Sequence, residues 1–258
     1  MAFRNRFQSS SNPFMKEEAL RNSTNQEVLD ADMTAAHIVT EKMTVMGAVN
    51  KSFILFGIML ITAAFSYQQP SMMFILLGVF GGLGVLIFAS FKKHLSGTLG
   101  PIYAALEGLF VGSITAMYAG ALGGGIVFHA ITLTFAVLFM MLFIYKTGLI
   151  KVTEKFRMGV FMATGAIMLV YLLSWILSFF GMSIPFLHEG GMLGIGISVV
   201  IIGIAALNLL LDFDMFEKGA QYGAPKYMEW FCGMGLLVTL IWLYVEILRL
   251  LAILSSSE

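Results

Sequence analysis

Residues 191–213 read GMLGIGISVVIIGIAALNLLLDF, an apolar run whose one charged residue is Asp212. The run is as long as the roughly 20 residues that an α-helix needs to cross a bilayer. It is apolar all round, which is typical of a helix immersed in lipid. Six further runs have the same character. The predicted spans are therefore 49–67, 71–91, 99–121, 124–145, 158–181, 191–213 and 227–254.

The composition of the whole chain agrees with these spans. Of its 258 residues, 59% are hydrophobic and 12% are charged, whereas about 25% are charged in an ordinary soluble domain. A soluble fold of this size could not hide that much apolar surface from water. We therefore expect an all-α, polytopic membrane protein with seven transmembrane helices, whose first partner is the lipid bilayer.

Charge and cysteine content exclude other classes. The 15 basic and 15 acidic residues balance, so nothing suggests nucleic-acid binding. A single cysteine, Cys232, gives neither an intrachain disulfide nor a thiolate metal cluster. We expect no bound metal and no cofactor.

Two domains are predicted. Residues 1–45 form a polar tail without the apolar core of a signal peptide, and residues 46–258 form the transmembrane domain. Lys and Arg occupy the tail and every second loop, while the alternate loops have none. By the positive-inside rule, the N-terminus is expected in the cytoplasm and the C-terminus outside.

Ionisable groups at membrane depth are candidates for function, because burying them is costly. Glu107 is expected about 12 Å and Asp212 about 9 Å from the cytoplasmic ends of their spans. Glu107 should then contact Asp212, Asn208 or a water-filled cavity. Further acids are expected at the same rim, as solvated interface residues or as partners, with two lysines as counter-ions. These residues are Asp214, Glu217 and Glu229, with Lys92 and Lys93.

Two other patterns concern helix contacts. Glu246 and Arg249 are spaced i, i+3 near the outer end of the last span, so they can form an ion pair on one helical face. Small residues at four-residue spacing predict close approach of helices. They are the pairs Gly78 and Gly82, Gly108 and Gly112, and Gly190 and Gly194.

No catalytic motif is apparent. The chain has no Gly-rich phosphate loop and no GxSxG, HExxH or CxxC pattern. A membrane aspartyl protease needs two facing aspartates, but Asp212 and Asp214 are two residues apart and point to different helix faces. We therefore expect that the protein is not an enzyme.

Three stretches resemble the Bax-inhibitor-motif family, in its bacterial YccA-like branch. They are PIYAALEGLFVGSIT (101–115), LLLDFDMFEKG (209–219) and GAPKYMEWFCGMGLLVTLIWLYVEILRLL (223–251). The resemblance implies a bundle with the seventh helix at its centre. It also implies a pH-sensitive calcium leak that is gated by aspartates on helices six and seven.

The same resemblance implies particular site residues. Asp212 matches the family's aspartate on helix six. For the second aspartate, one register places Glu246 there and another, aligned on Arg249, places Thr239. By depth alone, Glu107 or Glu229 is a better partner for Asp212 than Glu246. The family's basic partner on helix two corresponds loosely to Lys92 or Lys93.

These patterns together predict a bacterial inner-membrane protein that leaks calcium or another cation in a pH-dependent way. The predicted ion-pathway and pH-sensing residues are Asp212, Glu107, Glu229, Glu246 and Asp214. The predicted gating counter-ions are Lys92, Lys93 and Arg249. The alternative is an interaction protein without transport activity that modulates a membrane protease such as FtsH, for which the polar tail is a docking segment.

Overall fold

The computed structural model describes residues 41–180 and 191–255, and it confirms the predicted fold class. Within these residues, seven helical segments are long and apolar enough to cross a membrane. The single-helix spans are α2 (Val45–Gln68), α6 (Gly125–Thr147), α7 (Glu154–Phe179), α9 (Met192–Gln221) and α10 (Met228–Ser255). The second span joins α3 (Met72–Leu76), η2 (Leu77–Gly82) and α4 (Leu83–Phe91), and the third joins η3 (Lys93–Leu95) and α5 (Ser96–Leu122).

Side-chain caps start several of these helices. The Thr44 and Thr153 hydroxyls accept hydrogen bonds from backbone N–H groups in the first turns of α2 and α7, and Ser71 does the same for α3. Such caps satisfy donors that have no partner within the helix. The predicted tail, residues 1–45, lies almost wholly outside the described residues, and α2 begins at its last position.

The helices extend beyond most of the predicted spans. The largest difference is at α9, which continues from the predicted end at residue 213 to Gln221. The apolar pattern stops at the charged residues, but the helix does not, because side-chain polarity does not remove the need to pair backbone groups. The end of α9 therefore carries Asp214, Glu217 and Lys218 as helical residues.

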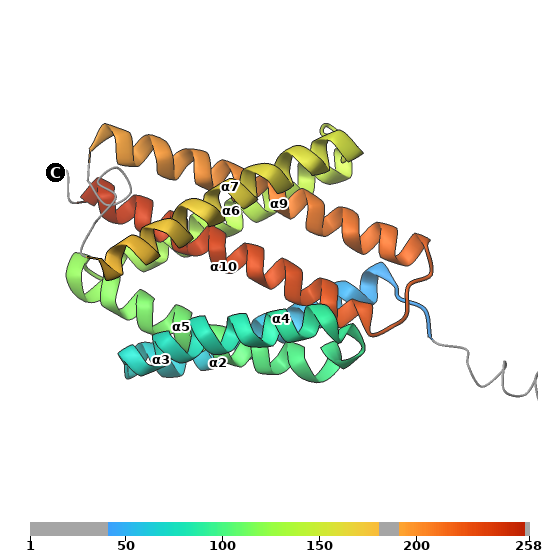
Figure 1. Cartoon of the computed structure of the whole chain (residues 1–258), viewed down its shortest axis with the longest axis horizontal. Coiled ribbons are helices and arrows are strands. Elements are labelled where there is room, and N and C mark those ends of the chain that lie inside the picture. The colour runs from blue at the N-terminus through green and yellow to red at the C-terminus, as the bar shows by residue number, and fades with distance from the viewer. Residues whose placement is uncertain (1–40, 181–190, 256–258) are drawn as a thin grey trace, which may run out of the picture. The chain divides into compact units, whose positions relative to one another are not determined.

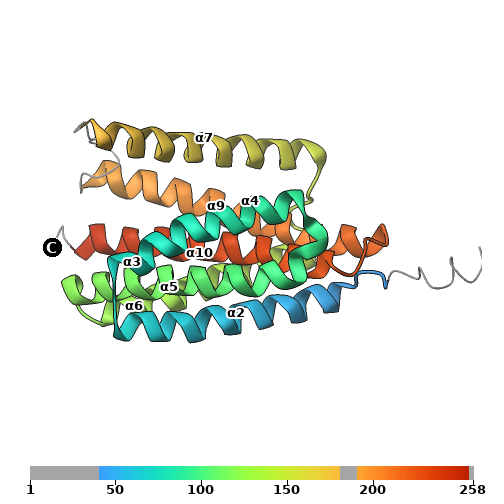
Figure 2. The same ribbon diagram turned by 60° about the horizontal axis from the view of Figure 1, so that its bottom comes forward.

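Helix α10 is at the centre of the bundle, as the resemblance implied. It packs directly against α2, α5, α6 and α9, and it lies between α9 and the pair α2 and α5 in both ribbon views (Figures 1 and 2). Helix α7 packs mainly on α9 and is more peripheral. A long series of α10 side chains is buried, including Met234, Leu237, Leu243 and Leu248.

Close helix packing occurs at the predicted small residues. A Cβ atom added at Gly108 or Gly112 would overlap backbone carbonyls of α2, and one added at Gly78 would overlap Phe110 of α5. Helix α5 is therefore held tightly between the first and second spans. Gly194 is buried within α9, whereas Gly190 lies outside the described residues.

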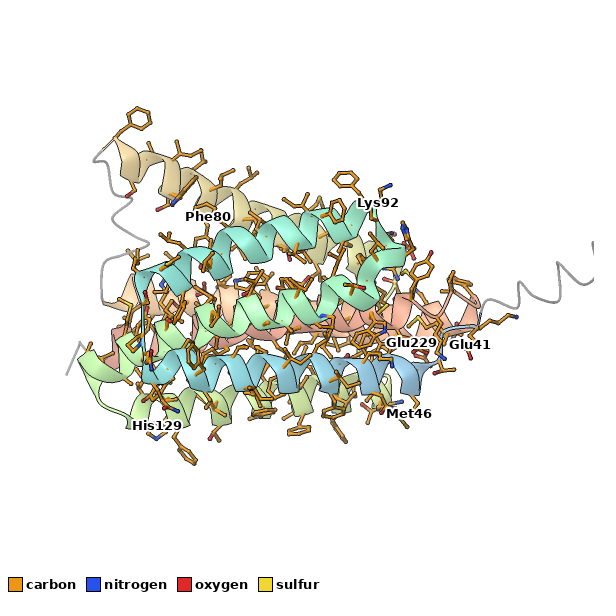
Figure 3. All side chains as sticks on the ribbon, turned by 90° about the horizontal axis from the view of Figure 1, so that it is seen from below. Glu41, Met46, Phe80, Lys92, His129 and Glu229 are labelled. Atoms are coloured by element: carbon orange, nitrogen blue, oxygen red, sulfur yellow. The ribbon has the colours of Figure 1, made fainter. Side chains whose placement is uncertain are left out.

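The two ends of the bundle differ in charge. Lys92 and Glu229 lie at one end, near the start of α2 at Met46, and His129 lies at the other (Figure 3). The lysines and arginines that the alternate loops carry are expected at the same end as Lys92, because successive spans run in opposite directions. We refer to this end as the lysine-rich end.

Candidate functional site

Asp212 is a buried acid that faces a neighbouring span. It lies on α9 with 7% of its surface exposed, and its carboxylate faces α10. Gly235 makes room for it, since a Cβ atom at that position would lie 3.6 Å from Asp212 Oδ1. The Thr239 side chain hydrogen-bonds to the carboxylate. The other oxygen, Oδ2, is buried and has no hydrogen-bond partner among the described residues.

Thr239 connects Asp212 to the backbone of α10. Its hydroxyl also lies 3.3 Å from the carbonyl oxygen of Gly235, to which it can donate. A hydroxyl carries one proton, so it cannot donate to Gly235 and to an ionised Asp212 at the same time. A protonated Asp212, however, can donate to Thr239 while Thr239 donates to Gly235. Proton binding at Asp212 therefore changes the hydrogen bonding of both helices.

The position of Thr239 bears on the second family aspartate. The alignment of helix seven on Arg249 puts Thr239, and not Glu246, at the position of the second family aspartate. Thr239 is also the α10 residue that hydrogen-bonds to Asp212. Glu246 lies two turns further along α10. Asp212 is also farther from its helix end than predicted, because nine residues follow it in α9, a length of about 14 Å.

Asp214 points away from Asp212, as its spacing predicts, and takes part in a charge network. Its Oδ2 lies 2.5 Å from Arg157 Nη2 on α7 and 3.0 Å from Lys218 Nζ on α9. Both cations also lie near Glu154, at 3.9 and 4.0 Å. The solvated role considered for Asp214 is therefore wrong, because this carboxylate joins two helices.

Glu229 holds the start of the first span. The N–H and the hydroxyl of Thr44 donate to Glu229 Oε1 at 3.0 and 3.2 Å. Glu229 is 3% exposed, and Gly47 leaves space for its carboxylate. A carboxylate at a helix N-terminus is stabilised by the unpaired N–H groups and the helix dipole. The predicted pairing of Glu229 with Asp212 is absent from the described contacts.

Glu107 lies against the π-helical segment η2 of the second span. Its Oε1 would lie 2.5 Å from a Cβ atom added at Gly82, and its hydrogen-bond partner is Tyr103, one turn earlier on α5. The expected contact of Glu107 with Asp212 or Asn208 is not found among the described residues, and Asn208 donates instead to Thr164 of α7 at 2.8 Å.

Glu246 and Arg249 form the ion pair that their spacing predicts, with Arg249 Nη1 3.6 Å from Glu246 Oε2. Tyr171 of α7 completes the group, since its hydroxyl donates to Glu246 Oε1 and accepts a 3.1 Å hydrogen bond from Arg249. Glu246 is 3% exposed. Glu246 Oε2 has no hydrogen bond among the described residues, but the Arg249 cation lies beside it, and this group attaches α7 to α10.

The predicted counter-ions do not pair with Asp212. Lys93 places its Nζ atom 5.2 Å from the centre of the Phe231 ring, a cation–π contact. Lys92 and Lys93 are both exposed, and no ion pair joins either lysine to Asp212 in the described part of the chain. The lysine clamp expected on Asp212 is therefore absent from this conformation.

The acids thus occupy separate environments instead of one rim cluster. Within residues 41–180 and 191–255, no three His, Cys, Asp or Glu side chains come together as a metal site. Exposed Glu217 accepts a hydrogen bond from Tyr145 of α6. The sequence reasoning missed the partners Tyr171, Arg157 and Thr44. A tyrosine within an apolar span was the available signal, because a buried hydroxyl needs a partner.

In the described part of the chain, six apolar spans and a central seventh, with carboxylates buried between them, define a polytopic α-helical membrane protein. The sequence model of the family described as Bax inhibitor 1 like matches residues 8–256, so the chain belongs to this family. No curated protein matches the chain.

Proposed function

We propose that this protein is a slow, pH-sensitive leak for calcium or another cation, with Asp212 at its gate. The observation that carries the proposal is the buried Asp212 carboxylate between α9 and α10, which has one oxygen without a partner. An ionisable group inside a membrane is costly, and one that is not fully paired is a candidate for contact with a transported ion or proton. The structural roles of Glu229, Glu246 and Asp214 leave Asp212 and Glu107 as the better candidates.

The conformation described corresponds to a closed gate in this proposal. Asp212 is surrounded by buried side chains, including Leu209 and Phe213 of its own helix. A cation reaches it only if α9 and α10 separate near Gly235. The carboxylate, the Thr239 hydroxyl and the Gly235 carbonyl would then offer oxygen ligands. Calcium takes six to eight oxygens. These three groups offer fewer, which suits brief passage of the ion better than tight binding.

The pH dependence follows from the hydrogen bonds of Asp212. When Asp212 loses its proton, the Thr239 hydroxyl can donate its hydrogen bond either to Asp212 or to the Gly235 carbonyl, but not to both. A change of charge at this one group therefore alters the α9–α10 contact without a lysine partner. This replaces the lysine-clamp mechanism as the proposed basis of gating.

The proposed location is the bacterial inner membrane, with the lysine-rich end toward the cytoplasm. The support is the distribution of Lys and Arg over alternate loops. Seven spans then place the end of α10 on the outer side.

Ion flux in reconstituted liposomes tests the proposal. The full chain should carry calcium, and Asp212→Asn should change the rate and its pH response. Glu217→Gln is the matched control, because Glu217 is an exposed carboxylate on the same helix. Equal effects of the two substitutions, or no flux by the full chain, would contradict a gate at Asp212.

A modulator of a membrane protease such as FtsH is the second candidate. The polar character of residues 1–45 favours it. Deletion of residues 2–40 separates the two functions. Flux that survives the deletion supports the leak. The modulator is supported if the full chain carries no flux and co-purifies with a protease, while the deletion variant does not co-purify with it.

A further inference from the structure

A second feature lies away from the acids. A crevice of about 370 Å³ is formed by side chains of α2, α5, α6 and α10. Its floor is buried and includes Val111, Ile241 and Tyr244, while its rim is exposed and includes Leu60 and Ile131. Helices α2 and α6 flank the crevice without packing extensively on one another. The crevice is therefore open sideways, toward the hydrocarbon of the bilayer.

The buried hydroxyls in the wall leave no role for water. Thr115 donates to the Val111 carbonyl at 2.6 Å, and Tyr244 pairs with Thr115 at 2.9 Å. Thr134 donates to the Ala130 carbonyl at 2.7 Å. A buried water needs two to four polar partners, and these groups are already bonded to one another or to backbone. The wall therefore favours a hydrocarbon occupant.

The length of the crevice matches one leaflet. Its lining on α2 runs from Phe56 to Tyr67, eleven residues along a helix, or about 16 Å. The hydrocarbon core of a bilayer is about 30 Å thick, so one leaflet is about 15 Å. Tyr67 is next to the last residue of α2, at the end away from the lysines, where tyrosines commonly lie at a membrane interface.

We propose that this crevice binds one acyl chain of a membrane phospholipid, from the leaflet opposite the lysine-rich end. The crevice lining has no charged side chain, so the carboxylate of a free fatty acid would have no partner there. A phospholipid keeps its headgroup at the interface near Tyr67 and inserts only its chain. This site is distinct from the gate at Asp212 and does not depend on the leak.

Photo-crosslinking tests the proposal with the full chain in phosphatidylcholine vesicles. A trace of phosphatidylcholine carrying a diazirine in mid-chain is activated, and the labelled peptides are mapped. Ala64→Phe fills the exposed side of the crevice and should lower labelling of the α5 and α10 lining severalfold. Ile61→Phe is the control, since Ile61 is on the same helix and 73% exposed but does not line the crevice. Equal labelling in both variants would overturn the proposal.

A second measurement does not depend on a bulky substitution. Thr134→Cys places a thiol in the wall of the crevice. The parent chain, whose one cysteine is the buried Cys232, gives the background level of thiol labelling. The new thiol should resist a charged methanethiosulfonate reagent, because a thiol in hydrocarbon stays protonated and only the thiolate reacts. Reaction with the charged reagent would show a water-filled crevice and overturn the proposal. Stronger labelling by a diazirine fatty acid than by the phospholipid would overturn the assignment of the source.

Discussion

Glu229 binds Thr44 across 185 positions of sequence, and this contact joins the start of the first span to the start of the last. One carboxylate oxygen accepts both the N–H and the hydroxyl of Thr44, and the Thr44 hydroxyl in turn caps the N–H of Gly47. The contact is a structural one, and it accounts for a buried acid that the sequence alone places among the ion-pathway residues.

Glu229→Ala should therefore destabilise the protein by about 1–3 kcal/mol, because it leaves buried donors without an acceptor. Thermal unfolding in detergent measures the change. Glu229→Gln keeps a carbonyl oxygen as the acceptor and should lose less. The pH profile of ion flux should be the same in the folded variants as in the parent. A shifted pH profile would return Glu229 to the sensing residues.

Asp212→Asn should remove most of the pH dependence of flux. The amide cannot ionise, so flux should stay flat from about pH 6 to pH 8, where the parent rate changes. Liposome flux at a series of pH values provides the measurement. Asp214→Asn should keep the pH response but lower stability, because it weakens the contacts with Arg157 and Lys218. If Asp212→Asn titrates like the parent, the sensor lies elsewhere, and Glu107 is the next residue to change.

Gly82→Ala should disturb the protein through Glu107, since the added methyl group would press on its carboxylate. Combination with Glu107→Ala removes the obstruction. The double variant should then recover stability relative to the sum of the single effects, with a coupling of about 0.5–3 kcal/mol. A double-mutant cycle of thermal unfolding measures this coupling. Strict additivity would show that Glu107 does not rest on η2.

Arg249→Met should be strongly destabilising, by about 3–5 kcal/mol, because it leaves Glu246 buried without its cation. Glu246→Gln in the same chain removes the uncompensated charge and should restore part of the loss. Unfolding of both variants and of the parent gives the comparison. A mild effect of Arg249→Met with no rescue would mean that water compensates Glu246.

Reporter fusions test the orientation. Fusions at residues 97, 152 and 222 should report the cytoplasm, and those at 122, 187 and 258 should report the outside. A cytoplasmic signal at 258 together with one at 222 would mean that the last span does not cross the membrane.

The sequence predicts the spans well because their physical cause is local: lipid requires long apolar helices, and the composition shows them directly. It also predicts that Asp212 and Asp214 diverge, since helical periodicity alone decides this. Apart from the Glu246–Arg249 ion pair, it does not predict the partners of the acids. Glu107 bonds Tyr103 on its own helix, and Asp214 bonds Arg157 of the preceding span. Pairs between helices, such as Asp214 and Arg157, depend on how the helices rotate and pack, which no apolar pattern encodes when each helix is apolar all round.

The π-turn of the second span changes how its faces are assigned. A turn with hydrogen bonds from i to i+5 contains one extra residue, so the helix after Gly82 is rotated by about 100° relative to an uninterrupted α-helix. A helical wheel drawn through Met72–Phe91 would therefore assign the residues of α4 to the wrong side. Deletion of Val79 would remove the extra residue, turn Lys92 and the following loop around the helix axis, and thereby change the direction from which α5 enters the bundle.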